Sequence, residues 1–281
     1  MQSKNPVFSR SEGFNGKPFD SGDNSQIIVN GDVGGPGGFG LPPATGRMTI
    51  ETVLEKSAIT LGLVMASAAA TWFFIGDLFV DGYYVDSEKM ALASGLAMGG
   101  AIVGLILSLV ISFRKKLSVG FILAYSVVEG VFIGAFSKMI SAYVGDSAIV
   151  FQAVMATMIA FGATLAAYKF FNIRVTPKFR KMITIAVFAF FAVTLVNFVL
   201  SIFGVLENGG LRSFGTLGLL VSAFAVGLAV FTLILDFDYI ERGIAMGLPE
   251  QESWRAAFGL TVTLIWMYIE ILRILAILRS N

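Results

Sequence analysis

The stretch FGLTVTLIWMYIEILRILAIL, residues 258–278, decides the fold of this chain. As a helix it is long enough to cross a bilayer, because a hydrocarbon core of about 30 Å takes about 20 apolar residues. Glu270 and Arg273 nevertheless lie inside it. A charged side chain at the centre of a membrane costs at least roughly 2.5 kcal/mol, so such residues usually face a bundle interior or an aqueous cavity and mark a proton or ion path.

Six further apolar stretches precede this one, and the composition is typical of a membrane protein. Hydrophobic residues make up 56% of the chain, charged residues only 14%, and the mean hydropathy is +0.80. The apolar runs are continuous and lack the alternation of barrel strands, so we predict helices. We expect an all-α polytopic membrane protein with seven spans, at 57–76, 91–113, 117–137, 148–168, 182–203, 214–236 and 257–278.

Lys and Arg predict the orientation, because the cytoplasmic loops of membrane proteins carry the excess of basic residues. With the N-terminus inside, the cytoplasmic segments hold Lys4, Arg10, Lys17, Arg47, Lys56, Arg114, Lys115, Lys116, Lys169, Arg174, Lys178, Arg180, Lys181, Arg242 and Arg255. The opposite side holds Lys89, Lys138, Arg212 and Arg279. We therefore expect a cytoplasmic N-terminus and, with seven spans, a C-terminus outside.

Residues 1–46 have a different composition from the rest of the chain. Gly, Ser, Asn, Asp and Pro dominate, and the segment ends in GDVGGPGGFGLPPATG. With little apolar surface to bury, it is expected to be a disordered cytoplasmic tail before a transmembrane domain at 47–281. The tail has no basic region followed by an apolar one, so it does not have the pattern of a cleaved signal peptide.

The residue types that are absent exclude several kinds of chemistry. The chain has no Cys and no His, which removes thiolate and imidazole nucleophiles, bases and metal ligands and leaves proton chemistry to carboxylates. The net charge is only +1 with the basic residues scattered over loops, so we expect no nucleic-acid partner. The expected surroundings are a lipid bilayer.

A second intramembrane acid, Asp236, ends the apolar run LGLLVSAFAVGLAVFTLILD of residues 217–236. At 100° per residue, Asp236 and Asp238 point to different faces of a helix. We expect Asp236 to point into the bundle. Asp238 and Glu241 are interpreted as a solvated helix end.

Two interpretations of Glu270 stay open. In one, it forms an ion pair with Arg273, one helical turn on. In the other, which we favour, Asp236 and Glu270 lie within hydrogen-bond or water-bridged reach and share one proton, since two adjacent carboxyls cannot readily both ionise. Such carboxylates also suit Ca²⁺, which takes hard oxygen ligands, so Asp236 and Glu270 are candidate metal ligands.

A third acid, Glu129, lies in AYSVVEGVFIGAF, residues 124–136. It either extends an ion path or forms a structural hydrogen bond to a neighbouring helix. Small residues recur here and in the preceding span at a spacing of four, which favours close helix packing within the bundle over a homodimer seam. These positions are Gly95 with Gly99, Gly100 with Gly104, and Ser126 with Gly130 and Gly134.

The sequence from about residue 48 to 280 resembles the Bax inhibitor-1 or YccA-like family, also called the transmembrane Bax-inhibitor-motif family. Leu235-Asp236 followed by Ile240 is similar to the family's aspartate-then-isoleucine pattern, and Tyr268-Ile269-Glu270-Ile271-Leu272 to its Tyr-Leu-Asp-Phe-Ile pattern. The third similarity is the junction that runs from Arg114-Lys115-Lys116 through Ser118-Val119-Gly120 to Tyr125 and Glu129-Gly130.

The resemblance implies a compact bundle around a central seventh span, in the plasma membrane of a bacterium. It implies closure on the cytoplasmic side by an acid pair, here Asp236 and Glu270, and by a basic latch within Arg114 to Lys116. Three departures affect this reading: the second acid is Glu, Arg273 replaces a common Asn, and the acids are more widely spaced along the chain.

We therefore expect a pH-sensitive Ca²⁺ leak pathway in which Asp236, Glu270, Arg273 and Glu129 form the ion path and sensor. No covalent cofactor and no enzymatic activity are expected; Ca²⁺ is the permeant or bound ion. Flux should fall as pH drops, because the acids hold together best when they share a proton. The alternative is a non-conducting regulator that binds membrane partners such as a quality-control protease. The sequence leaves the oligomeric state open.

Overall fold

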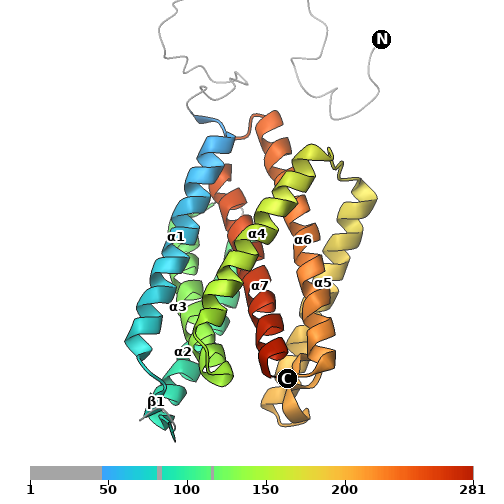
Figure 1. The fold of residues 1–281 in the computed structure, drawn as a ribbon. Coiled ribbons are helices and arrows are strands. Elements are labelled where there is room, and N and C mark those ends of the chain that lie inside the picture. Colours follow the sequence, from blue (N-terminus) through green and yellow to red (C-terminus); the bar gives the residue numbers. More distant parts are fainter. Residues whose placement is uncertain (1–45, 81–83, 115–116, 281) are drawn as a thin grey trace, which may run out of the picture. The chain divides into compact units, whose positions relative to one another are not determined.

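The computed structural model describes residues 46–80, 84–114 and 117–280. This part of the chain forms seven helices long and apolar enough to cross a membrane (Figure 1), which confirms the predicted all-α class. They are α1 (Ile50–Ile75), α2 (Ser87–Phe113), α3 (Val119–Val144), α4 (Ala148–Phe170), α5 (Pro177–Ile202), α6 (Thr216–Ala245) and α7 (Glu252–Ser280). The hairpin β1 (Phe79–Val80) and β2 (Tyr84–Val85) joins α1 to α2, and the 3-10 helix η3 (Glu207–Arg212) joins α5 to α6. The predicted tail at 1–46, apart from Gly46, lies outside the described residues.

Several helices extend beyond the apolar runs because capping groups, and not hydropathy, set their ends. α1 begins at Ile50, where the side chains of Thr49 and Thr52 each accept the other residue's backbone N–H, at 3.2 and 3.0 Å. α5 begins at Pro177, with the Thr176 hydroxyl accepting the N–H of Phe179. The ends of the bundle are therefore built from polar turns.

The proximal end of the bundle is where α1 begins and where α6 connects to α7; the distal end is where α1 and α7 end. At the proximal end, Met48 N–H donates to Leu248 O at 2.8 Å and Glu250 N–H to Gly46 O at 2.7 Å. Lys56 of α1 forms an ion pair with Glu250 at 2.9 Å. The start of α1 is thereby tied to the α6–α7 connection.

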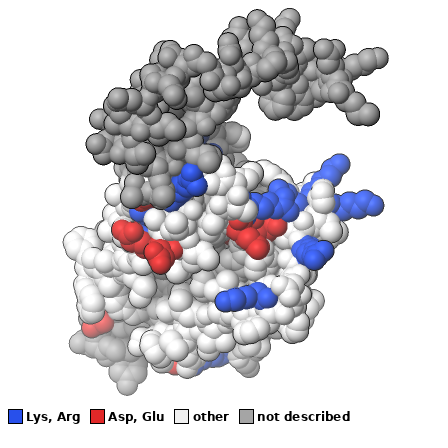
Figure 2. Space-filling view, turned by 90° about the horizontal axis from the view of Figure 1, so that it is seen from above, with Lys and Arg blue, Asp and Glu red and all other residues white. Residues whose placement is uncertain are grey.

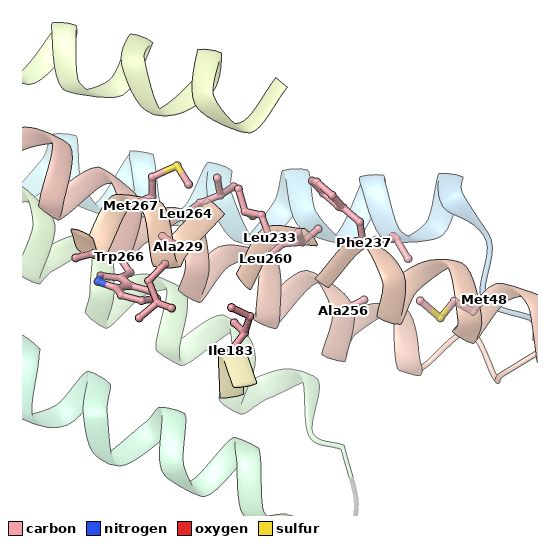
Figure 3. Packing of buried hydrophobic residues seen from close by; sticks show 13 residues of the cluster. Met48, Ile183, Ala229, Leu233, Phe237, Ala256, Leu260, Leu264, Trp266 and Met267 are labelled. Atoms are coloured by element: carbon pink, nitrogen blue, oxygen red, sulfur yellow. The ribbon is translucent and has the colours of Figure 1, made fainter. Parts of the chain in front are cut away.

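The last helix, α7, lies at the centre of the bundle and contacts α1, α3, α4 and α6 (Figure 1). In its most apolar window 72% of the residues are buried, against 11 to 44% in the other six spans. Figure 3 shows the cluster that α6 and α7 share, where Leu233 of α6 lies beside Leu260 of α7. The expected central position of the seventh span is confirmed.

Glycines permit the closest approaches between helices, as predicted for some of the small residues. A Cβ atom added to Gly134 of α3 would lie 2.4 Å from the Ala68 carbonyl oxygen of α1, and one added to Gly100 of α2 would lie 2.9 Å from the Phe132 Cβ of α3. Gly95 and Gly99, in contrast, have nothing within 4 Å among the described residues. Only part of the four-residue pattern is therefore a packing seam.

We predict that Gly134→Ala lowers the stability of the bundle by about 1 to 3 kcal/mol, because the added methyl group forces α1 and α3 apart. Gly99→Ala is the matched control and should be neutral or slightly stabilising, since it removes only the conformational freedom of glycine. Unfolding in detergent micelles, followed by circular dichroism, measures both. Equal effects of the two substitutions would contradict the seam.

Candidate functional site

Asp236 lies on the face of α6 that meets α7. The Thr263 hydroxyl of α7 donates to Asp236 Oδ2 at 2.7 Å, and the same hydroxyl lies 3.1 Å from the Gly259 carbonyl oxygen. Thr263 is 4% exposed and Asp236 is partly buried. Among the described residues no Lys or Arg forms an ion pair with Asp236, so its partner in the seam is a neutral hydroxyl.

The Thr263 hydroxyl is suited to both protonation states of Asp236. A hydroxyl carries one hydrogen and can also accept. With Asp236 ionised, Thr263 donates to the carboxylate; with Asp236 protonated, Asp236 donates to Thr263, which turns its hydrogen to the Gly259 carbonyl. This Asp236–Thr263 contact is therefore satisfied before and after a proton is taken up.

Glu270 lies in a different environment, in an ion pair at the distal half of α7. Its Oε1 accepts from Arg212 Nη1 of η3 at 2.9 Å, and its Oε2 lies 4.0 Å from Arg273 Nε. Glu270 is 2% exposed, and Oε2 has no hydrogen-bond partner among the described residues. The carboxylate is thus held between two guanidinium groups.

Arg273 fixes this arrangement to the neighbouring elements. It donates to the Arg212 carbonyl oxygen at 2.7 Å and to Ser222 Oγ of α6 at 3.4 Å. Its guanidinium also lies over the Phe214 ring, 5.3 Å from the centroid. Arg212, Glu270 and Arg273, here called the distal triad, join η3, α6 and α7 with two positive charges against one negative.

The prediction that Asp236 and Glu270 form a proton-sharing pair is wrong. Asp236 binds Thr263, which precedes Glu270 by seven residues on the same helix (270 − 263), or about 10 Å at 1.5 Å per residue. Glu270 has its partner in Arg212 instead. The long spacing between the two acids along the chain places them at different levels of the bundle.

Asp238 differs from the predicted solvated helix end because it is buried, whereas Glu241 is exposed as predicted. Asp238 is 6% exposed and forms ion pairs with Arg180 of α5 at 2.5 Å and with Arg242 at 3.0 Å. Glu241 accepts the hydroxyl of Tyr168 of α4 at 2.5 Å. These acids tie α4 and α5 to the proximal end of α6. The i, i+4 spacing of Asp238 and Arg242 was the signal in the sequence for this pairing.

Glu129 lies in the seam between α2 and α3. It is 9% exposed, and its Oε1 would lie 2.5 Å from a Cβ added to Gly104 of α2. The Tyr125 side chain lies beside it, one turn earlier. The structure therefore does not bring Glu129 together with Asp236 or Glu270, and the three acids occupy three separate places.

The remaining predicted site residues are the latch and the metal ligands. Arg114 follows α2, and its guanidinium lies 4.8 Å from the centroid of the Phe121 ring of α3. Lys115 and Lys116 lie outside the described residues. Among the residues that the structure describes, no group of three or more acidic side chains could hold a metal ion. The Ca²⁺ site at Asp236 and Glu270 stays a prediction; the two acids have separate partners, Thr263 and Arg212.

Seven long apolar helices, of which the last is buried at the centre and carries charges, define a polytopic α-helical membrane protein. A family profile described as Bax inhibitor 1 like matches residues 5–280, and the chain belongs to this family. Members of the family are generally non-enzymatic. A search of curated proteins finds no match to the chain.

We predict that Glu270→Ala destabilises the protein by about 3 to 5 kcal/mol, because it leaves two guanidinium groups of the distal triad without their carboxylate. Lys89→Ala removes a more exposed ion pair with Asp86 at the same end of the bundle and should cost at most about 1 kcal/mol. Denaturant unfolding of both variants in detergent measures the difference. A Glu270→Ala loss as small as the control would show that the triad is not a structural ion-pair cluster.

Proposed function

We propose that the protein is a pH-sensitive cation leak pathway of the plasma membrane, with Ca²⁺ as the permeant ion, and that the packed bundle is its closed state. The observation that supports this is the Asp236–Thr263 contact. Asp236 is an intramembrane acid in the seam between α6 and the central helix α7, and its partner, the Thr263 hydroxyl, is neutral. Intramembrane acids of this kind typically belong to proton or ion pathways.

The proposed gating depends on the charge of Asp236. When it is protonated, Asp236 and Thr263 form a neutral hydrogen bond that keeps α6 and α7 together. When it is ionised, a carboxylate stands in a low dielectric without a cation, which is unfavourable unless water or a cation enters. Carboxylate, hydroxyl and carbonyl oxygens of Asp236, Thr263 and Gly259 are the hard ligands that Ca²⁺ takes.

The distal triad is assigned a different role, as a seal. Two guanidinium groups surround Glu270, so its charge is balanced by fixed partners that any permeating cation would have to replace. The excess positive charge of the triad also repels cations. In this scheme Asp236 is the sensor, and Glu270, Arg212 and Arg273 form the closed outer end.

The orientation belongs to the same proposal. The distribution of basic residues favours a cytoplasmic N-terminus, which places the proximal end in the cytoplasm and the distal triad toward the outside. Asp236 then lies on the cytoplasmic half of the α6–α7 seam and would respond to cytoplasmic pH.

The rival function is a non-conducting regulator that binds other membrane proteins. One observation favours it: Glu129, Asp236 and Glu270 have separate surroundings instead of forming a row across the bundle. A regulator needs a stable bundle and a contact surface but no path for ions.

We predict that Ca²⁺ flux into liposomes carrying the purified protein falls as the pH is lowered. Protonation removes the charge of Asp236 and restores the neutral contact that closes the seam. Asp236→Asn should abolish most of this pH dependence, because an amide does not titrate in this range. Thr263→Val should change the pH dependence of the flux, because it removes the hydroxyl that binds Asp236. Glu129→Gln is the matched control for loss of an intramembrane acid and should leave the pH dependence intact.

Two results would contradict the proposed gating. One is an absence of Ca²⁺ flux in the wild type at every pH, which would leave the regulator as the better reading. The other is a pH profile that is the same in the wild type and in Asp236→Asn, which would remove Asp236 as the sensor.

We further predict that Arg114→Ala raises the resting flux, if the basic segment at 114–116 acts as a latch at the cytoplasmic mouth. The expected reason is a loss of positive charge that repels an entering cation. Arg174→Ala, an exposed arginine in the α4–α5 connection, is the control. Labelling of both termini checks the orientation; a changed orientation with unchanged flux would show that the segment is only a topology signal.

A further inference from the structure

A groove with a basic lining lies at the proximal end of α5, outside the site described above. It has a volume of about 360 Å³ and is lined by Pro177, Arg180, Lys181, Thr184, Ile185 and Arg242. All but Arg242 come from α5 and recur at intervals of three or four residues, so they form one face of the first turns of that helix. Arg242 comes from the last turn of α6. Figure 2, which views the proximal end, shows Lys and Arg side chains gathered on one side of this face, close to acidic ones.

The two arginines of the groove are held in fixed positions by one buried carboxylate. Asp238 pairs with both Arg180 and Arg242, at 2.5 and 3.0 Å, and Arg242 also donates to the Val175 carbonyl oxygen at 3.1 Å. Their side chains nevertheless stay about half exposed, at 46 and 48%. Each guanidinium has five N–H groups, so both keep donors for a further ligand.

The charges of the groove do not balance. Arg180, Arg242 and Lys181 contribute three positive charges, and Asp238 contributes one negative charge. A guanidinium pair fixed in advance binds phosphate in a bidentate manner and loses little freedom when it does so. The groove therefore has the charge and the donor geometry for a phosphate group.

The surface next to the groove indicates a lipid as the source of that phosphate. Ile185 lines the groove at its membrane side and is 57% exposed, and Met182 and Phe188 on the same helix are 58 and 72% exposed. A basic pocket above an apolar surface, between two membrane-spanning helices, matches a headgroup with its acyl chains below. A soluble phosphate would gain nothing from this apolar side.

We propose that this groove binds the headgroup of an anionic phospholipid, with Arg180 and Arg242 on the phosphate, Lys181 as a second cation and the exposed Thr184 hydroxyl as a further donor. In the proposed orientation the headgroup belongs to the cytoplasmic leaflet. The inference does not depend on whether the protein conducts ions. It adds a lipid contact that holds α5, which packs against α6 and η3, to the proximal end of α6.

Native mass spectrometry of the full chain in detergent, titrated with phosphatidylglycerol or phosphatidylcholine, tests the proposal. We expect the wild type to retain phosphatidylglycerol in preference to phosphatidylcholine. Lys181→Ala should weaken this retention about five-fold, in line with the contribution of one basic residue near an anionic lipid. Lys178→Ala is the matched control, because Lys178 is an exposed lysine of the same helical turn that does not line the groove; it should leave retention unchanged.

Thr184→Val and Arg180→Lys test the groove further, and in both variants Asp238 keeps two positively charged partners. Both should reduce retention, the first by loss of a donor and the second by loss of the bidentate fork. Equal losses in Lys181→Ala and Lys178→Ala would overturn the proposal in favour of diffuse surface charge. No preference for phosphatidylglycerol would also overturn it. Displacement of the lipid by millimolar inorganic phosphate would replace it with a site for a soluble anion.

Discussion

Lipid offers no hydrogen bonds, so a polar side chain on the central helix α7 is stabilised by a partner inside the bundle. The neighbouring elements supply these partners one by one. Thr52 and Thr60 of α1 meet Ser253 and Thr261, each at 2.8 Å, and Ser137 of α3 meets the Tyr268 hydroxyl at 2.7 Å. Asp236 of α6 meets Thr263, and Arg212 of η3 meets Glu270. These contacts fix the depth at which each helix packs on α7.

The charged side chains inside the bundle divide into two kinds. Lys56, Asp238 and Glu270 are buried, and each has a partner of opposite charge within 3.0 Å. Removing one partner of such a buried ion pair strongly destabilises a protein, so these pairs suit a structural role. Asp236 and Glu129 differ, since neither has an ion pair among the described residues, and of the two only Asp236 lies in the α6–α7 seam, against a hydroxyl of α7. A change in its protonation alters the charge of the seam without breaking an ion pair, which is why we assign the sensor to Asp236 and the seal to the distal triad.

The seven spans and the central place of the last one were predictable because hydropathy and the order of short motifs depend only on local sequence. The relevant intramembrane acids were also visible as single charges in apolar runs. Their partners were not, because the level at which α6 meets α7 is set by packing between helices. Arg212 illustrates this: in the sequence it is one loop residue that marks topology, and only the fold of η3 brings it to Glu270. Asp238 and Arg242 have the i, i+4 spacing of a helical ion pair, so this contact was predictable from the sequence.

In the proposed gating, Asp236 is the acid of the α6–α7 seam that takes up a proton while Glu270 keeps its ion pair. Infrared difference spectroscopy of the reconstituted protein across a pH titration tests it directly, because a protonated carboxyl group has a carbonyl stretch that a carboxylate lacks. In a Glu129→Gln background, we expect a carboxyl band that grows as the pH falls, shifts in Thr263→Val, disappears in Asp236→Asn and persists in Glu270→Gln. A band that persists in Asp236→Asn and disappears in Glu270→Gln would contradict the account.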